Sequence, residues 1–524
     1  MTLSATRTHG EREDRPRIAE VETPGFTLLW HPDPRRIGER AVLAGLDTDR
    51  TVELSRTSPR FAHPGSTPKR PLDDPFISRR PIVLRPGSEA DTIEVIPTHS
   101  GSDLWLDGEI VTASVTLDAE ALERGVVLMI AHRVVALLHR LDPLAPAATA
   151  ADGLVGQSAA LAAVRRDIRA VADVDVPVLL RGESGVGKEL VAAALHGAGG
   201  RSQGPFVAVN MAAIPASLAA SELFGSARGA FTGARAGRRG HFGRADGGTL
   251  FLDEIGDTPA EVQPLLLRAL ETGELQTVGA DGSSRVEVRL VTATDAALET
   301  EVAAGRFRAP LLHRLRGFEI LIPPLRQRRD DFGVLFRYFL EQALASIDAR
   351  RTLAPAVDQA RPWMPAPLVA RLAVYDWPGN IRELRNIVQQ VAISSRDRER
   401  AELPPPVLAQ LERGPAIDPE VDRRRDCSAP SARLPGEITD RELEDALRRH
   451  RWRPQAAARH LGISRAAVYT LIERHPSLRK GSELGADEIE ACARRHRDDL
   501  ARMAEDLRVS ETALKRRMRQ LGLR

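Results

Sequence analysis

The chain has 524 residues, 42% of them hydrophobic, with 74 basic and 72 acidic side chains. This length predicts three or four domains of soluble globular protein. It contains no run near the roughly 18 consecutive apolar residues of a membrane helix, and its first residues lack the apolar core of a secretory signal. Cys427 and Cys492 are the only cysteines, which excludes a disulfide framework and a cysteine-rich zinc site and favours a cytoplasmic location.

The first 142 residues are predicted to form a disordered polar segment followed by a domain of β-strands. Residues 1–22 are polar and charged, and we expect them to be disordered. Residues 23–142 contain short apolar or alternating runs separated by turn residues, which predicts a β-sandwich. These runs lie at 26–30, 51–54, 81–85, 92–96, 104–110 and 126–130.

The central part alternates between strand-like and helical runs. An Ala/Pro-rich linker at 144–150 precedes residues 152–396, whose alternation predicts a parallel α/β domain. We divide it into an α/β part, 152–324, and a helical lid, 325–396. A Pro/Arg-rich stretch at 397–436 is predicted to be a linker, and the remaining tail is helical throughout.

The tail repeats itself after 46 residues without a gap. Residues 437–478 align with 483–524, with Leu443 opposite Ile489 and Leu461 opposite Leu507. Such an alignment predicts a duplicated helical unit. Residues 437–524 carry 20 basic and 15 acidic side chains, an excess of the kind that nucleic-acid contact leaves. Aromatic residues are only 4%, which favours double-stranded over single-stranded partners.

Each repeat has features of a helix-turn-helix, although a plain helical hairpin is the alternative. In the first, small and apolar residues flank a turn at Gly462, and the following helix would present its first residues to base edges. In the second, Arg508 replaces the turn glycine, and a basic cluster is suited to phosphate contacts. The candidate DNA-binding residues are Ser464, Arg465, Thr470, Lys515, Arg516 and Arg519.

A glycine-rich loop stands between an apolar run and a helical segment. It has the pattern G-x-x-x-x-G-K, formed by Gly182, Glu183, Ser184, Gly185, Val186, Gly187 and Lys188. Glycines let backbone N–H groups cradle phosphate, and the lysine supplies a point charge. The alternative is a turn without a ligand. The context of strand, loop, lysine and helix favours a phosphate-binding loop.

Glu189 stands where a hydroxyl normally binds Mg²⁺, so the metal must rely on phosphates, water and another carboxylate. Asp253 and Glu254 end a later apolar run. Asp253 can hold Mg²⁺ through water, and Glu254 can position or deprotonate an attacking water. A solvated acidic turn is the alternative reading of this pair.

Five motifs occur in the order seen in sigma-54-dependent transcriptional activators, which are AAA+ ATPases, and residues 154–395 resemble that family. The motifs are GESGVGKE, ELFG, GAFTGA, GGTLFLDEIGD and WPGNIREL. The tail resembles a Fis-type helix-turn-helix. The resemblance implies a homo-oligomeric ring, a hexamer in this family, that acts on sigma-54 RNA polymerase while the tail binds upstream double-stranded DNA. It also implies that the GAFTGA loop contacts the sigma factor through Gly229, Ala230, Phe231, Thr232, Gly233 and Ala234.

The same resemblance assigns roles in the ATP site. It implies that Lys188 contacts the phosphates, that Asp253 and Glu254 are the Walker B pair, and that Asn210 holds Glu254 until nucleotide is sensed. Arg308 and Arg314 correspond to arginine fingers that reach the γ-phosphate of a neighbouring subunit. The other implied nucleotide-binding residues are Leu154, Val155 and Gly156 near adenine, Thr294 and Asp295 at sensor I, and Arg382 at sensor II.

This chain departs from the family at two of these places. It has Ala309 and Pro310 where the family usually has Glu-Asp, and Asp295 where sensor I is normally Asn. An acid at sensor I would lie near the γ-phosphate, which makes the hydrolysis rate an open question.

The predicted sandwich resembles a forkhead-associated (FHA) domain, a reader of phosphothreonine. The resemblance implies a phosphate pocket formed by Arg56, Ser78 and Arg79. Pro81 and Asp107 depart from the family pattern. A sandwich used only for docking is the alternative.

Together these features predict an ATP-driven activator of sigma-54 transcription with ATP and Mg²⁺ as cofactors. Two alternatives stay open. One is a DNA-binding regulator with a weak nucleotide switch, and the other is an AAA+ remodeller of another kind.

Overall fold

The computed structural model describes residues 23–46, 50–89, 91–98, 101–142, 153–227, 238–279, 283–347, 353–359 and 361–413. In the tail it describes 439–449, 485–496, 500–509 and a few single positions. The predicted disordered segment 1–22 and the linker at 144–150 lie outside these residues. The chain forms two compact units, 1–416 and 417–524. No helix among the described residues has the length and apolar character needed to cross a bilayer.

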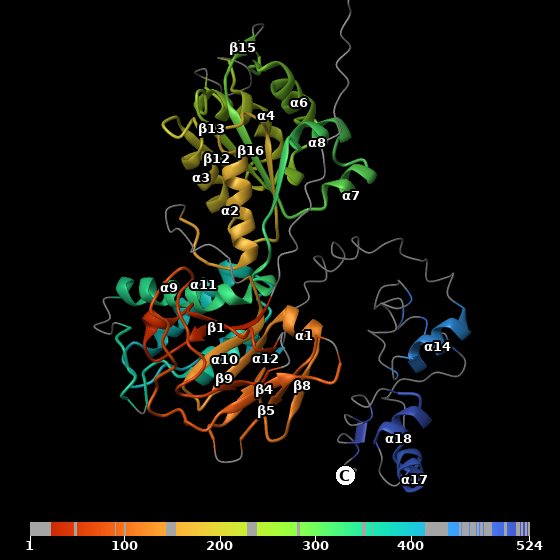
Figure 1. Cartoon of the computed structure of the whole chain (residues 1–524). Helices are drawn as coiled ribbons and strands as arrows, with labels where there is room; N and C mark the ends of the chain where they lie inside the picture. Colours follow the sequence, from red (N-terminus) through yellow and green to blue (C-terminus); the bar gives the residue numbers. More distant parts are fainter. Residues whose placement is uncertain are drawn as a thin grey trace, which may run out of the picture. The chain divides into compact units, whose positions relative to one another are not determined.

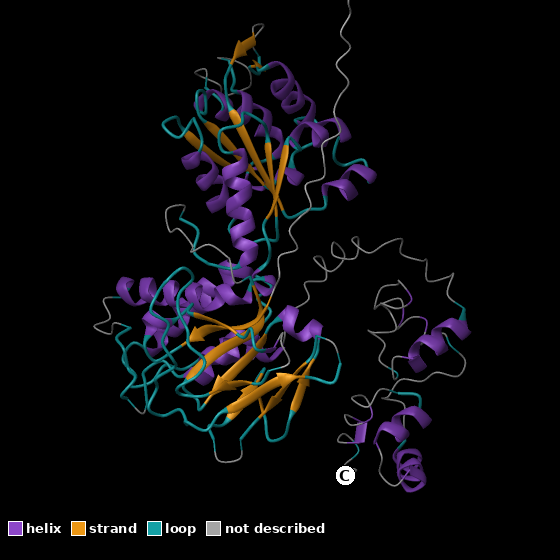
Figure 2. Ribbon diagram, viewed as in Figure 1, coloured by secondary structure: helices purple, strands orange, loops and turns teal. Residues whose placement is uncertain are grey.

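Two antiparallel sheets form the predicted β-sandwich (Figures 1 and 2). One sheet has the order β2-β1-β10-β9-β6-β7 and the other β3-β4-β5-β8. All six predicted runs coincide with strands, while β2, β8, β10 and the helix α1 are additional. The elements are β1 Thr23–Trp30, β2 Arg40–Val42, β3 Val52–Leu54, β4 Ile82–Pro86, β5 Ile93–Ile96, β6 Leu104–Leu106, β7 Glu109–Ile110, β8 Val115–Leu117, α1 Ala119–Arg124, β9 Val126–Ile130 and β10 Val134–Leu141.

The next domain is the predicted parallel α/β fold. Its sheet has the order β12-β13-β16-β11-β17, and all neighbouring strands are parallel. The strands are β11 Val178–Arg181, β12 Phe206–Asn210, β13 Thr249–Asp253, β16 Arg289–Thr294 and β17 Phe318–Leu321, with a hairpin of β14 Glu274–Gln276 and β15 Ser283–Arg285. The helices are α2 Ala159–Val171, α3 Lys188–Ala198, α4 Ala216–Phe224, α5 His241–Arg244, α6 Gln263–Thr272, α7 Leu298–Ala303 and α8 Ala309–Leu315. The carboxyl ends of parallel strands share one edge, which is where such sheets bind ligands.

The lid is longer than the sequence predicts. Its helices are α9 Phe332–Ser346, α10 Ala366–Val374, α11 Asn380–Ser395 and α12 Pro405–Arg413. Helix α12 lies inside the predicted linker 397–436, so the first part of that linker belongs to the lid. Proline at the first helical position is well tolerated, and Val407 of α12 is buried in the lid core. The three consecutive prolines at 404–406, two of which lie in the first turn of α12, resemble a linker in the sequence, and only this packing reveals the helix.

The sandwich and the lid share one hydrophobic core. The indole ring of Trp30 meets the ring of Phe336 edge-on at 5.9 Å, and Met129 and Leu137 belong to the same buried cluster. The opposite face of β1 carries Phe26 and Leu28 into the interior of the sandwich. A strand that is buried on both faces has a continuous run of apolar residues, because no alternate position faces water. This explains the apolar sequences of β1, β9 and β10.

Polar bonds reinforce this joint. The guanidinium of Arg40 lies 2.9 Å from the carboxylate of Asp330, and Arg337 donates to the carbonyl of Pro34 at 2.9 Å. Arg133 of the sandwich, 3% exposed, pairs with Asp74 of the same domain at 3.0 Å and donates across the joint to the carbonyl of Val357 at 2.9 Å. Burial raises the pKa of Asp330, and Arg40 opposes that rise. Arg40, Asp330 and Arg133 are therefore largely buried at this joint, and each is paired.

The tail forms two small cores, as its repeat predicts. Helix α14 is Asp440–Arg449, and α17 and α18 are Ala486–His496 and Leu500–Asp506. Leu443 and Leu461 lie in one core, and their repeat partners Ile489 and Leu507 lie in the other. Arg508 has a φ of +54°, the left-handed conformation that favours glycine. The position equivalent to Gly462 is therefore a tight turn in the second repeat.

Candidate nucleotide-binding site

The phosphate loop joins β11 to α3 and depends on its glycines. Gly185 and Gly187 have φ of +79° and +103°, in the region that favours glycine. A Cβ on Gly185 would lie 2.4 Å from the carbonyl oxygen of Gly379 in the lid, so only glycine allows this approach. Gly187 caps α3 without a side-chain hydrogen bond. The first N–H groups of α3 are thus left for an anion.

Lys188 and Glu254 lie beside each other at the end of this loop. Lys188 is 7% exposed, and its Nζ donates to the carbonyl of Gly182 at 3.1 Å and lies 3.6 Å from Oε1 of Glu254. Burial raises the pKa of Glu254, Lys188 lowers it, and Asp295 and Asp253 raise it further. A carboxylate whose pKa is raised toward neutrality is a better general base than an ordinary one.

Asp253 ends β13 and lies opposite Asn210 of β12 in the sheet. The Asn210 amide is 3.5 Å from Oδ2 of Asp253, whereas the sequence predicts that Asn210 restrains Glu254. Oδ1 of Asp253 is buried and has no hydrogen-bond partner among the described residues. A buried acceptor normally has a partner, and a carboxylate oxygen left over in this way fits a water on Mg²⁺.

The lid closes over the phosphate loop through Asn380. This residue is fully buried and has a φ of +52°. Its Oδ1 accepts from the N–H of Leu325 at 2.9 Å, while its Nδ2 donates to Glu183 at 3.1 Å and to the carbonyl of Ser184 at 3.0 Å. Arg382 donates to the Ser184 hydroxyl at 3.0 Å. Asn380 is not among the predicted site residues, although it stands in the WPGNIREL motif.

Hydrogen bonds to Asp331 and from Arg165 of α2 fix the predicted adenine-binding segment and the two residues that follow it. Oδ1 of Asp331 accepts from the N–H groups of Gln157 and Ser158 at 2.5 and 2.8 Å. Arg165 donates to the carbonyls of Leu154 and Gly156 at 2.6 and 3.0 Å. Asp331, which follows the lid residue Asp330, is another site residue that the motifs do not reveal.

Comparison with known proteins identifies domains in the central and C-terminal parts of the chain. Three family models match in order: the Sigma-54 interaction domain at 154–321, the AAA+ ATPase lid domain at 326–416, and the bacterial regulatory protein, Fis family, at 437–474. The chain is 45% identical over 263 residues to the regulatory protein LuxO of Vibrio cholerae, covering 50% of this chain and 48% of LuxO. These matches identify a sigma-54 interaction domain, an AAA+ lid and a Fis-family segment in this chain.

A further relative is the nitric oxide reductase transcription regulator NorR1 of Cupriavidus necator, 41% identical over 336 residues, which cover 61% of this chain and 63% of NorR1. A crystal structure of NtrX from Brucella abortus in complex with ATP is 31% identical, with a TM-score of 0.43, and the match covers 62% of this chain and 69% of NtrX. The chain spans about half to two thirds of the length of these curated relatives.

The matches assign three parts of the chain to known domain families. Residues 154–321 form an AAA+ P-loop ATPase domain, and the lid model ends at 416, in agreement with α12. None of the three models covers residues 23–142. The β-rich fold of that region is confirmed, and its FHA identity stays a prediction.

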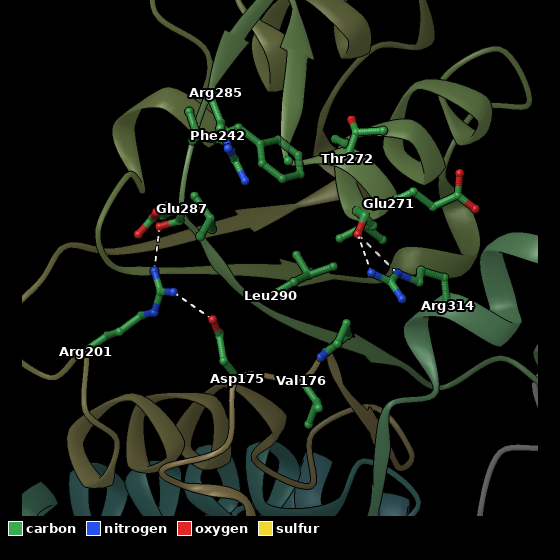
Figure 3. Close-up of a pocket in the computed structure, with 16 residues that line it drawn as sticks. Asp175, Val176, Arg201, Phe242, Glu271, Thr272, Arg285, Glu287, Leu290 and Arg314 are labelled. Atoms are coloured by element: carbon green, nitrogen blue, oxygen red, sulfur yellow. Dashed lines mark hydrogen bonds and ion pairs between the residues drawn. The ribbon is translucent and has the colours of Figure 1, made fainter. Parts of the chain in front are cut away.

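The two predicted arginine fingers lie at α8. Arg308 is exposed, and its backbone N–H donates to Gln263 at 2.9 Å. Arg314 donates to the carbonyl of Leu270 at 2.8 Å and lines a cavity of about 440 Å³ with Arg201 (Figure 3). Pro310 stands in the first turn of α8, where proline is accommodated. The departure from Glu-Asp at 309–310 therefore leaves the helix intact.

The base of the predicted sigma-factor loop is described, but the loop is not. Ser226 and Arg238 exchange backbone hydrogen bonds of 3.1 and 2.9 Å, and Ala227 donates to the carbonyl of Val278 at 2.9 Å. Gly225 has a φ of +87° and packs against this bridge. The loop residues Gly229, Ala230, Phe231, Thr232, Gly233 and Ala234 lie outside the described part of the chain. So do the DNA-binding candidates Ser464, Arg465, Thr470, Lys515, Arg516 and Arg519.

The three predicted phosphopeptide residues are neighbours in the sandwich. The N–H of Arg56 donates to the carbonyl of Ser78 at 3.0 Å, and Arg79 follows with an exposed side chain. The guanidinium of Arg56 lies 3.9 Å from Asp73. Asp107 does not face outward as a free acid, because its Oδ1 accepts from the N–H of Val127 at 2.9 Å.

Proposed function

We propose that this chain is an ATP-dependent activator of sigma-54 RNA polymerase that binds double-stranded DNA upstream of promoters. The observation that carries the proposal is the pairing of Lys188 with Glu254 at a phosphate loop that the lid contacts through Asn380. This pairing supplies both requirements of phosphoryl transfer, a cation for the phosphates and a carboxylate for the attacking water. The matched Fis-family segment supports DNA binding.

ATP would lie with its phosphates on the loop 182–188 and its adenine beside Leu154, Val155 and Gly156. In this arrangement Lys188 turns from Glu254 toward the phosphates, which frees the carboxylate to orient and deprotonate water. Mg²⁺, when bound, neutralises charge on the phosphates, and Asp253 is the residue that would hold it through water. Arg382 approaches from the lid through its contact with Ser184.

Assembly into a ring, a hexamer by family analogy, would complete the site. Among the described residues, Arg308 and Arg314 form hydrogen bonds with Gln263 and Leu270 of α6. Within the described part of the chain, neither arginine has a hydrogen bond to the phosphate loop of its own subunit. Such a position suits side chains that act on the next subunit. Hydrolysis would then move the loop 229–234 against the sigma factor and open the promoter.

The test is a purified full chain assayed for ATP turnover and for open-complex formation by sigma-54 RNA polymerase on a promoter with an upstream site. The proposal requires both activities, and both must depend on ATP hydrolysis. Nucleotide binding without turnover would instead support the nucleotide-switch regulator, for which the acid at Asp295 is the favouring observation. Turnover without promoter opening would support another kind of remodeller.

We also propose that the sandwich binds a phosphothreonine segment through Arg56, Ser78 and Arg79. The support is the backbone hydrogen bond between Arg56 and Ser78, which brings the two segments together, and the exposure of Arg79. Phosphothreonine carries about −1.5 to −2 charges and strong acceptor oxygens. The full chain should bind a phosphothreonine peptide more tightly than its unphosphorylated form, and Arg56→Ala should remove the difference. Equal affinities would leave the sandwich as a docking module.

A further inference from the structure

A turn of the sandwich, residues 38–40, meets the chain directly beside the predicted adenine segment, residues 154–156. Arg40, the first residue of β2, donates to the carbonyl of Gln157 at 2.7 Å. The side-chain amide of Gln157 donates in return to the carbonyl of Gly38 at 2.6 Å. Two hydrogen bonds therefore join the sandwich to the residue that follows the adenine segment.

The start of the lid holds the same stretch through two adjacent carboxylates. Asp331 accepts from the N–H groups of Gln157 and Ser158 at 2.5 and 2.8 Å, and from the Ser158 hydroxyl at 2.7 Å. Its neighbour Asp330 pairs with Arg40 at 2.9 Å. The same guanidinium nitrogen of Arg40 bonds Asp330 and the carbonyl of Gln157. Arg40 thus links the sandwich, the lid and the α/β domain.

The turn that carries Arg40 is itself fixed. The backbone of Arg40 exchanges hydrogen bonds of 2.7 and 3.1 Å with Ala62. Gly38 has a φ of +91°, and a Cβ there would lie 2.4 Å from the side-chain nitrogen of Gln157 and 2.8 Å from Val334 of α9. Only glycine allows the turn to approach both so closely. The contact is therefore preformed by the fold of the sandwich.

The charge of Arg40 also matters for the two lid acids. Asp330 is 8% exposed and Asp331 is fully buried. Burial raises the pKa of Asp330, and Arg40 opposes that rise. Burial and the neighbouring Asp330 both raise the pKa of Asp331, while Arg328 lowers it. Removing one partner of a buried ion pair leaves an uncompensated charge. Without Arg40, that charge would stand beside the carboxylate that holds Gln157.

Gly156 passes these contacts on to the predicted adenine segment. A Cβ on Gly156 would lie 2.7 Å from the carboxyl group of Asp331, so its backbone packs directly against that acid. A shift of Asp331 or of Gln157 would consequently move Gly156. A binding segment that is already held in place loses less conformational freedom when its ligand binds, which increases affinity.

We propose that Arg40 is a positioning residue for ATP: from the sandwich, outside the site itself, it holds Gln157 and Asp330 and thereby pre-organises the adenine segment. This inference rests on the proposed function, because it takes the adenine to lie beside residues 154–156. It adds that the sandwich sets the affinity for nucleotide through the base. The contacts of Lys188 with the phosphates do not depend on it.

Isothermal titration of the full chain with two probes tests this division. The probes are ADP and inorganic tripolyphosphate, which has phosphates but no base. We expect Arg40→Met to weaken ADP binding by about tenfold, the effect of one charge-assisted hydrogen bond. Tripolyphosphate binding should stay within about twofold. In steady-state assays the KM for ATP should rise while kcat changes little, as expected when binding is lost equally from substrate and transition state.

Two further variants control for effects on the fold. Gln157→Met removes the bond to Gly38 without leaving a buried charge, and it should weaken ADP binding by about 2- to 12-fold. It therefore tests the inference even if Arg40→Met does not fold. The matched control is Arg337→Met, because Arg337 also crosses the joint, to the carbonyl of Pro34 at 2.9 Å. It should keep the parent's ADP affinity. Thermal unfolding confirms that each variant is folded.

Three results would overturn the inference. They are an unchanged ADP affinity in folded Arg40→Met and Gln157→Met proteins, an equal loss of tripolyphosphate binding, and an equal loss in Arg337→Met. Lys188→Ala separates such a failure from a failure of the proposed function. If the parent binds ADP and Lys188→Ala abolishes that binding, the ATP site stands and only the role of Arg40 is refuted. If the parent binds no ADP, or binds it independently of Lys188, both fail together.

Discussion

Substitution of Asn380 tests how the lid controls nucleotide binding. Asn380→Ala removes three hydrogen bonds, to Leu325, Glu183 and Ser184. At about 1 kcal/mol for each net hydrogen bond, the loss is about 3 kcal/mol, and the buried N–H of Leu325 is left unpaired as well. Each 1.4 kcal/mol of this loss that is expressed in ATP binding raises the dissociation constant tenfold. We expect the affinity for ATP to fall by about 10- to 100-fold.

Binding of a fluorescent ATP analogue to the full chain measures this loss, with circular dichroism to confirm the fold. Asn380→Gly separates two causes, since glycine loses the same bonds but accepts the φ of +52° without strain, whereas alanine pays about 1–2 kcal/mol there. Asn386→Ala, at an exposed position of the same helix, is the matched control. An affinity within twofold of the parent in a folded Asn380→Ala protein would refute the role of these bonds.

Four further predictions concern the ATP site and its output. Lys188→Ala should abolish turnover and leave thermal unfolding nearly unchanged, because the lysine's partners are a carbonyl and an acid at the site. If hydrolysis needs Glu254 ionised, turnover should fall on the acid side of its raised pKa, and Asp295→Asn should move that fall to lower pH in a pH–rate profile, because it removes a charge that raises the pKa. Inactive Arg314→Ala protein should regain part of its turnover when mixed with Lys188→Ala protein. If the mixed oligomer forms but turnover does not recover, Arg314 acts on the ATP of its own subunit. Thr232→Ala should keep ATP turnover and lose promoter opening, and a joint loss would make its loop structural.

Local patterns were sufficient for much of the fold. Six sandwich strands, the parallel α/β alternation and the phosphate loop each have a signature within a few neighbouring residues. The repeat in the tail was also visible, because Leu443 and Ile489 occupy equivalent places in two small cores.

Features that depend on distant contacts could not be read in this way. Asn380 and Asp331 act by meeting backbone groups some 170 to 200 residues away in the chain, and neither residue type is diagnostic by itself. The family motif predicts that Asn210 restrains Glu254. In the structure the Asn210 amide instead lies 3.5 Å from Asp253, because the strand register places the two residues opposite each other. Helix α12 was hidden by its prolines.

The hydrophobic core that the sandwich and the lid share limits where the chain can be truncated. A fragment that begins at residue 153 would keep every ATP-site residue but expose the side of α9 and α10 that Trp30, Met129 and Leu137 cover. Monomeric proteins rarely tolerate contiguous apolar patches beyond a few hundred Å². Such a fragment is therefore prone to self-association, and activity gained or lost on truncation would report on aggregation as much as on release from control.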